Sequence, residues 1–217
     1  MASVKHHHTY RAQALDRKLY GVFTGIVEKN DDPEHEGRVK LSFPWLDDVT
    51  ITDWCRVLQP YAGPKYGAMF VPEKQSEVLV AFVHGDMNEP VVIGGLYNGD
   101  DKPPTYHDGT KQDVKMIRTK AGHVFRLDDS AQARAIELKT AGGHDVVLDD
   151  QNKKVTLATS GGHRIEMDDQ GMKIAISAKG GQAKVTLDAS GNVTIEGVDV
   201  QVKAKVLELS GDKVLIG

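Results

Sequence analysis

The chain has 217 residues, which is enough for one or two domains of ordinary size. Its net charge of -4 and pI near 6.1 exclude the basic surface that is typical of proteins binding nucleic acid or anionic membranes. The one cysteine, Cys55, excludes an internal disulfide framework and indicates folding in a reducing compartment.

The N-terminal region has no apolar core of a signal peptide, and no run of about 18 apolar residues occurs anywhere in the chain. We therefore expect assembly in the cytoplasm. Abundant glycine and few aromatic residues favour short strands with tight turns over helices. A lone cysteine usually packs as a small hydrophobic residue, so a catalytic thiol is not expected. The triplet His6–His8 is consistent with either a native segment or an added tag.

Residues 20–99 are expected to form an oligonucleotide/oligosaccharide-binding (OB) barrel after an N-terminal segment of residues 1–19. Five runs have strand-like alternation: Tyr20–Glu28, Gly37–Phe43, Thr52–Leu58, Glu77–His84 and Pro90–Tyr97. Five short strands without a long helix fit such a barrel. Nucleic-acid binding would require basic residues and exposed aromatic residues on the barrel face. This segment is instead rich in acidic residues, so we interpret it as a structural collar.

Residues 100–115 are a proline-containing linker, and the repeats of residues 116–217 follow it. A phrase of glycine, histidine, alternating apolar residues and two aspartates occurs at residues 122–129, 143–150 and 162–169, with a weaker copy at residues 183–188. The histidine, or Ala183 in its place, recurs at intervals of 21, 19 and 20 residues. A fixed period of this length indicates stacked structural repeats.

Each repeat is predicted to contain two strands. Apolar residues alternate with polar ones within each copy, and a second alternating run follows it, as at Ile136 and Leu138 or Val155 and Leu157. Asp-Asp pairs separate the two strands at one side. Glycine pairs such as Gly142-Gly143 supply sharp bends at the other.

A chain of such strands has one apolar face and no helix to cover it, and an exposed apolar sheet invites aggregation. Winding three identical chains around one axis would cover all three faces. The sequence therefore predicts an all-β protein whose C-terminal part is an intertwined trimeric β-helix or β-prism. A single-chain parallel β-helix is the alternative. The predicted trimer core comprises His123, Phe125, Leu127, Ile136, Leu138, His144, Val146, Leu148, Val155, Leu157, His163, Ile165, Met167, Ile174, Ile176, Val185, Leu187, Val193 and Ile195.

The aspartate pairs and the histidines have structural interpretations as well as chemical ones. Aspartates at turns suit Ca²⁺, but the glycine-rich calcium repeat is absent, so turn formation is favoured. Acid pairs that occur once per repeat do not resemble a single glycosidase site. Inward histidines could hold a metal or an anion, or donate a hydrogen bond to the adjacent turn, which we favour. We predict no catalytic residue, no metal site and no cofactor.

Near the C-terminus, the alternation of Val198, Val200 and Val202 and the apolar end predict shorter strands that finish the shaft bluntly. The predicted platform at the tip is formed by Val214, Leu215, Ile216 and Gly217.

Two segments of the first hundred residues resemble the OB domain of phage baseplate spikes and VgrG-type spikes. They are Gly21–Val27 with Gly37–Trp45, and Glu77–Asp86 with Pro90–Asn98. In that family a trimeric β-helical needle follows the barrel. The resemblance implies the membrane-piercing central spike of a contractile injection system: a phage tail, a tailocin, an extracellular particle or a type VI device.

The sequence also departs from the family pattern. VgrG chains carry a hub domain ahead of the barrel, whereas about twenty residues precede it here, so we expect a separate hub protein as a partner, contacted by the N-terminal segment of residues 1–19. No lysozyme domain interrupts residues 100–115. The iron-binding His-x-His tip of some members is missing, which favours a separate PAAR-type cap or effector. The alternative function is a β-helical enzyme that degrades cell-surface polysaccharide or peptidoglycan.

Overall fold

The computed structural model describes residues 18–106, 109 and 112–215, and these residues divide into two compact units between Pro103 and Pro104. Among them the regular structure consists of β-strands and two short 3-10 turns, so the protein is all-β as predicted. Most of the predicted hub-contacting segment lies outside the described residues. So do the platform residues Ile216 and Gly217 and part of the predicted linker.

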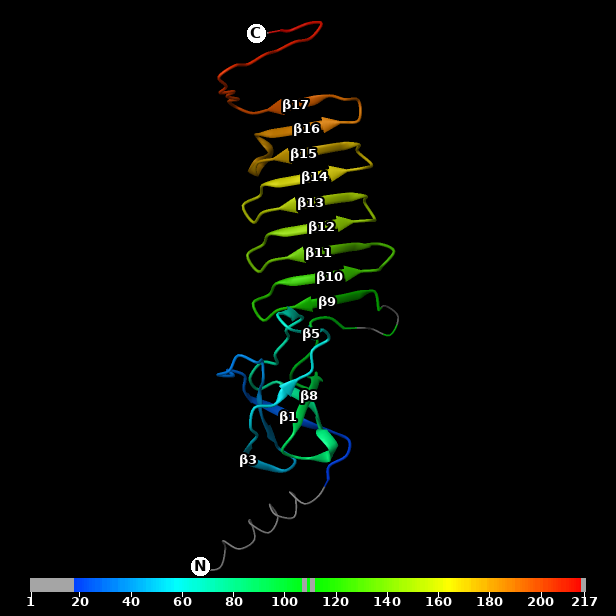
Figure 1. Cartoon of the computed structure of the whole chain (residues 1–217). Helices are drawn as coiled ribbons and strands as arrows, with labels where there is room; N and C mark the ends of the chain where they lie inside the picture. The colour runs from blue at the N-terminus through cyan, green and yellow to red at the C-terminus, as the bar shows by residue number, and fades with distance from the viewer. Residues whose placement is uncertain (1–17, 107–108, 110–111, 216–217) are drawn as a thin grey trace, which may run out of the picture. The chain divides into compact units, whose positions relative to one another are not determined.

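The N-terminal unit contains a six-stranded sheet with the order β3-β2-β1-β7-β8-β4 (Figure 1). Neighbouring strands are antiparallel except for β4 and β8, which are parallel. The strands are β1 (Val22–Lys29), β2 (Lys40–Phe43), β3 (Asp47–Ile51), β4 (Arg56–Val57), β7 (Glu77–Phe82) and β8 (Pro90–Gly95). A separate hairpin of β5 (Ala62–Gly63) and β6 (Tyr66–Gly67) leaves this sheet, and the 3-10 turn η1 (Val83–Gly85) follows β7.

Alternating residues of these strands form the core of the N-terminal unit. The fully buried aliphatic side chains are Val27, Val39, Leu41, Val78, Val80 and Val92. Three phenylalanines and Trp45 pack at one side of this core, with ring centroids 5.1 to 5.6 Å apart. Cys55 is 2% exposed, and burial raises the pKa of its thiol. It therefore packs as a small hydrophobic residue, as the sequence predicted.

Each of the five strands predicted in this unit overlaps a strand of the structure, but the bounds differ and the structure has additional strands. The predicted strand Thr52–Leu58 is reduced to the two residues of β4, and β3 precedes it. The hairpin β5–β6 was also missed, because its glycines, proline and tyrosines lack the alternation that identifies a strand.

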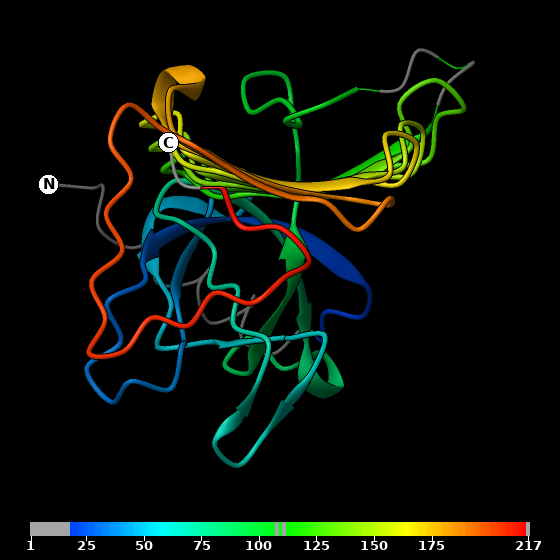
Figure 2. The same ribbon diagram turned by 90° about the horizontal axis from the view of Figure 1, so that it is seen from above.

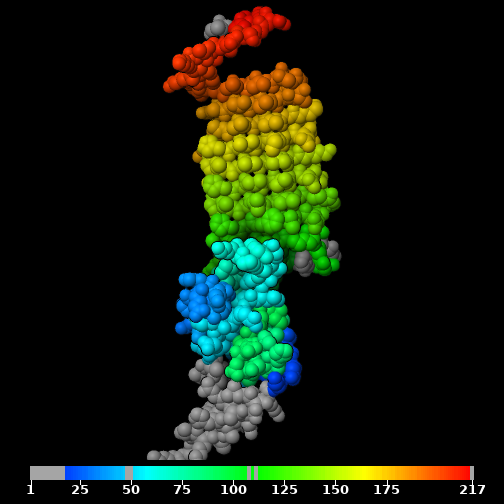
Figure 3. Space-filling model, in the orientation of Figure 1, coloured from blue at the N-terminus to red at the C-terminus, as the bar shows by residue number. Residues whose placement is uncertain are grey.

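The C-terminal unit is a nine-stranded sheet in which each strand pairs with the next one along the chain. Strands β9 to β17 follow one another as an antiparallel meander and form regular layers (Figure 3). Their bounds are β9 (Val114–Arg118), β10 (Val124–Asp128), β11 (Ala135–Lys139), β12 (Asp145–Asp149), β13 (Lys154–Ala158), β14 (Arg164–Asp168), β15 (Lys173–Ser177), β16 (Lys184–Asp188) and β17 (Val193–Glu196). Viewed end-on, the strands superimpose as one curved sheet (Figure 2).

The two-strand repeat was therefore predicted correctly, although β9 was missed. All pairs in this sheet are antiparallel, which excludes the alternative of a single-chain parallel β-helix. Glycine is required at one corner of the repeat, since Gly122, Gly143 and Gly162 have φ values of 94°, 84° and 88°.

One prediction for this unit was wrong. Residues 197–215 form no strand and are exposed, whereas shorter strands were expected there. A strand needs a neighbour to accept its backbone hydrogen bonds, and this chain offers the segment none.

Candidate oligomerisation surface

One face of the nine-stranded sheet carries two rows of apolar side chains, which we call the first and second apolar rows. The cross-strand register places the members of each row directly opposite one another on successive strands. The first row is Ile117, Phe125, Leu138, Val146, Leu157, Ile165, Ile176, Val185 and Ile195. The second row is Leu127, Ile136, Leu148, Val155, Met167, Ile174, Leu187 and Val193. Every apolar residue of the predicted trimer core lies in one of these rows, and Ile117 was missed.

The apolar rows are not covered in the single chain. Ile174 is 42% exposed, Leu138 and Ile176 are each 49% exposed, and Ile195 is 60% exposed. Within residues 112–215 no apolar side chain is buried, whereas Asp128, Thr156 and Asp168 are. A soluble monomer rarely leaves a contiguous apolar surface of this kind uncovered. Burial of each large side chain would contribute about 1.5–3 kcal/mol.

The three predicted histidines border an open groove along the first apolar row. The groove has a volume of about 860 Å³, and its lining includes seven residues of that row together with His123, His144 and His163. The histidines were expected to donate a hydrogen bond to a turn, but for His123 and His144 the direction is the reverse. The backbone N–H of Ala141 donates to Nδ1 of His123, and that of Ser160 donates to Nδ1 of His144, each at 3.3 Å. The turn presents an N–H rather than a carbonyl, so Nδ1 is the acceptor.

The opposite face of the sheet is polar and carries its own ion pairs. Arg126 contacts both Glu137, at 2.9 Å, and Asp128. On later strands Lys154 pairs with Asp168 at 3.1 Å, and Arg164 pairs with Glu166 at 2.7 Å. These charges pair with one another within a strand, as Arg164 does with Glu166, or across neighbouring strands, as Arg126 does with Glu137. This face therefore needs no partner, in contrast to the apolar one.

The first aspartate of each Asp-Asp pair closes a turn, as predicted. Asp149 accepts hydrogen bonds at 2.8 Å from the backbone and the side chain of Asn152, which lower the pKa of its carboxyl group. Asp168 accepts one from the backbone of Gly171 at 2.8 Å, which likewise lowers its pKa. Among the described residues of this chain no three histidine, cysteine or acidic side chains gather as metal ligands would.

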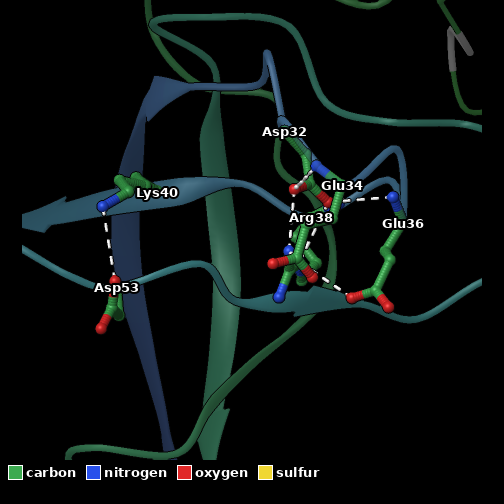
Figure 4. Close-up of polar contacts among 6 residues, drawn as sticks. All are labelled: Asp32, Glu34, Glu36, Arg38, Lys40 and Asp53. Atoms are coloured by element: carbon green, nitrogen blue, oxygen red, sulfur yellow. Dashed lines mark hydrogen bonds and ion pairs between the residues drawn. The ribbon is translucent and has the colours of Figure 1, made fainter.

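A buried ion pair fixes the loop between β1 and β2 in the N-terminal unit (Figure 4). The carboxylate of Asp32, 3% exposed, accepts hydrogen bonds from Nε and Nη2 of Arg38, both at 2.9 Å. It also accepts hydrogen bonds from the backbone of Glu34 and Glu36. The Arg38 guanidinium, with help from these amides, holds the pKa of Asp32 well below its usual range. Asp32 is one of several acidic residues of this segment, and its pairing with Arg38 was not predicted from the sequence.

The geometry is that of an all-β protein with an OB-type unit and an antiparallel repeat sheet, and comparisons with known proteins identify both. Residues 23–97 match the family model of the Type VI secretion system/phage-baseplate injector OB domain. Residues 135–216 match that of the phage baseplate V C-terminal trimerisation domain. The chain therefore belongs to the family of phage-baseplate and type VI injector spike proteins.

Curated relatives are similar to parts of this chain. The type VI secretion system spike protein VgrG3 of Vibrio cholerae is 29% identical over 162 residues, which are 69% of this chain and 16% of that protein. VgrG5 of Pseudomonas aeruginosa, also named a spike protein, is 36% identical over 112 residues, or 49% of this chain and 13% of the relative. The actin cross-linking toxin VgrG1 of V. cholerae is 30% identical over 54% of this chain and 11% of the toxin.

The chain thus spans less than a fifth of the length of these relatives. Among its described residues, none belongs to a helix with the length and apolar character needed to cross a membrane.

Proposed function

We propose that this chain is the homotrimeric, membrane-piercing central spike at the tip of the inner tube of a contractile injection system. The observation that carries the proposal is the uncovered apolar face of the C-terminal sheet, which coincides with a trimerisation domain. Three copies that turn this face inward would form a prism with a continuous apolar interior and the ion-paired polar faces outward. The prism would act mechanically, because it unfolds slowly, and not through a chemical step.

The mass of the purified protein tests the proposal directly. Light scattering is expected to give three times the chain mass of 23.7 kDa. A compact monomer that stays in solution at micromolar concentration would overturn both the trimer and the piercing role, because one chain cannot cover its own apolar rows.

The proposed partners are a separate hub protein at the N-terminal end and a PAAR-type cap or effector at the C-terminal end. Val214 and Leu215 are exposed, at 48% and 79%, and offer an apolar platform for a cap. A purified PAAR-repeat protein should be retained by the immobilised trimer and lost when Leu215→Asp is introduced. Ser210→Asp places the same charge a few residues earlier and serves as the control. Equal retention by both variants would remove the platform from the proposal.

We further propose that the chain acts without catalysis, as the spike names of VgrG3 and VgrG5 suggest. The turn aspartates recur in several repeats and are engaged in turn hydrogen bonds, which suits a structural role better than an acid–base pair. Incubation of the protein with peptidoglycan and capsular polysaccharide should release no soluble fragments. Turnover of either substrate would favour the enzyme instead.

A further inference from the structure

The hairpin β5–β6 presents aromatic side chains to solvent on a rigid support. Tyr61 and Tyr66 contact each other with ring centroids 5.3 Å apart, yet they are 64% and 55% exposed. The hairpin extends away from the body of the N-terminal unit (Figure 2). Met69 and Phe70, which follow it, are 72% and 57% exposed. Tyrosine, methionine and phenylalanine are enriched at protein–protein interfaces.

The base of this hairpin is fixed by a two-way hydrogen bond. The side-chain amide of Gln59 donates to the carbonyl oxygen of Phe70 at 3.2 Å and accepts from the backbone N–H of Phe70 at 2.9 Å. The backbone N–H of Ala68 donates to the carbonyl of Tyr61 at 2.8 Å. A loop held in this way loses little conformational entropy when a partner binds, so the exposed rings are preorganised for contact.

A second apolar surface lies on the outer face of the sheet in the same unit, opposite its buried core. The cross-strand register aligns Val22 of β1 with Ala81 of β7, and Ala81 with Val91 of β8. The next row in the same direction is Thr24 and Leu79. Val22 is 56% exposed, although the exposed face of a small barrel is ordinarily polar. We call these five residues the outer patch.

Charge complementarity connects the two surfaces. Lys65 lies at the tip of the hairpin, in a left-handed conformation with φ of 66°. Glu77 lies opposite Ile26 at one end of the outer face, and Glu28 is two residues further along β1 on that same face. Both carboxylates already accept hydrogen bonds, from Asn98 and Ser42, which hold them in place.

We propose that the β5–β6 hairpin of one copy of this chain packs on the outer patch of the next copy, so that three N-terminal units close a ring. This inference rests on the proposed homotrimer. A three-fold ring requires two different, mutually complementary surfaces on each copy, and the hairpin and the outer patch are such a pair. The tyrosines would cover Val22, Leu79 and Val91, and Lys65 would approach Glu77 and Glu28. The N-terminal units then contribute to assembly independently of the C-terminal sheet.

Cysteine cross-linking of the full chain tests the proposal. Lys65→Cys combined with Glu77→Cys should give disulfide-linked dimers and trimers on a non-reducing gel of samples boiled in SDS, and reduction should return the monomer band. Each single variant should give no disulfide-linked trimer on this gel, since the native Cys55 is buried. Lys65→Cys with Asp31→Cys is the matched control, because Asp31 is exposed in the β1–β2 loop outside the outer patch.

Light scattering on the same samples separates the possible failures. A trimer in solution without a covalent ladder, or with an equal ladder in the control, overturns the hairpin contact and leaves the proposed spike intact. A monomer in solution overturns both. As a second measurement, Tyr66→Ser should increase hydrogen exchange of β1 and β7 in the trimer, with a smaller effect from Tyr106→Ser, whose ring is 82% exposed outside the hairpin. No change with Tyr66→Ser would also contradict the contact.

Discussion

At the scale of single residues, the ion pair of Asp32 and Arg38 has the clearest expected effect on stability. Asp32 bonds two guanidinium nitrogens and several backbone amides, so its pKa in the folded state is depressed. A depressed carboxyl pKa stabilises the fold above the unfolded value, near 3.9, and this contribution is lost as the pH falls below that value toward the folded pKa. The pair therefore stabilises the N-terminal unit at neutral pH.

Asp32→Asn should accordingly lower the urea midpoint of the N-terminal unit at pH 7, and its difference from the wild type should narrow when the pH is lowered to about 3. Fluorescence of Trp45 and Trp54 measures this, because the chain has only these two tryptophans. Asp53→Asn is the control: that side chain is 97% exposed and contacts Lys40 at 3.4 Å, so little change is expected. If Asp32→Asn lowered the urea midpoint by the same amount at both pH values, the effect would not be due to the charge of Asp32.

The glycine corner of the repeat gives a second prediction at this scale. Gly143 has φ of 84°, and a Cβ atom there would lie 3.3 Å from Cβ of Ser160. Gly143→Ala should destabilise the C-terminal unit by about 1–2 kcal/mol. Gly142→Ala, where the nearest atom would be 3.9 Å away, should be close to neutral. Chemical denaturation followed by circular dichroism, at equal protein concentration, compares the two; equal destabilisation would contradict the requirement for a left-handed residue.

At the scale of elements, the apolar rows lead to a prediction about assembly. Ile174 of β15 lies between Met167 and Leu187 in the second row, so Ile174→Asp would place a charge in the proposed interior. It should abolish the trimer in light scattering and on denaturing gels, because an unpaired buried charge costs more than the contacts can offset. Ser177→Asp on the opposite face lies across from Arg164 and should leave the trimer intact. An SDS-resistant trimer of Ile174→Asp would place this row outside the core.

The sequence predicted the elements that depend on local alternation and missed those that depend on distant parts of the chain. Strands β10 to β17 repeat one pattern. The place of each strand in the sequence and the face to which its side chains point therefore follow from the period of the apolar residues and from the turn residues. The hairpin β5–β6 and β3 lack that pattern. Residues 198–202 show the alternation but form no strand, because a strand also requires a paired neighbour, which sequence spacing does not supply.

The same distinction applies to the candidate surface. The apolar residues of the predicted core share one face of the sheet, since a period of two fixes the face once the strand is known. The partner of Asp32 could not be assigned, because the loop must first fold back to bring Arg38 to it. The histidines were placed beside the glycine turn, but the direction of their hydrogen bond depends on which backbone group the turn presents.

At the scale of the whole molecule, folding of the C-terminal sheet and association of the chains are expected to be one process. A group of chains that unfolds as it dissociates becomes more stable as protein concentration rises, by mass action. The guanidinium midpoint of the C-terminal unit, followed by circular dichroism, should therefore rise between about 1 and about 100 µM protein. Ile174→Asp should remove this dependence, whereas Ser177→Asp should preserve it. A wild-type midpoint that is independent of concentration would mean that the sheet is stable alone, and its exposed apolar rows would then require a different explanation from trimerisation.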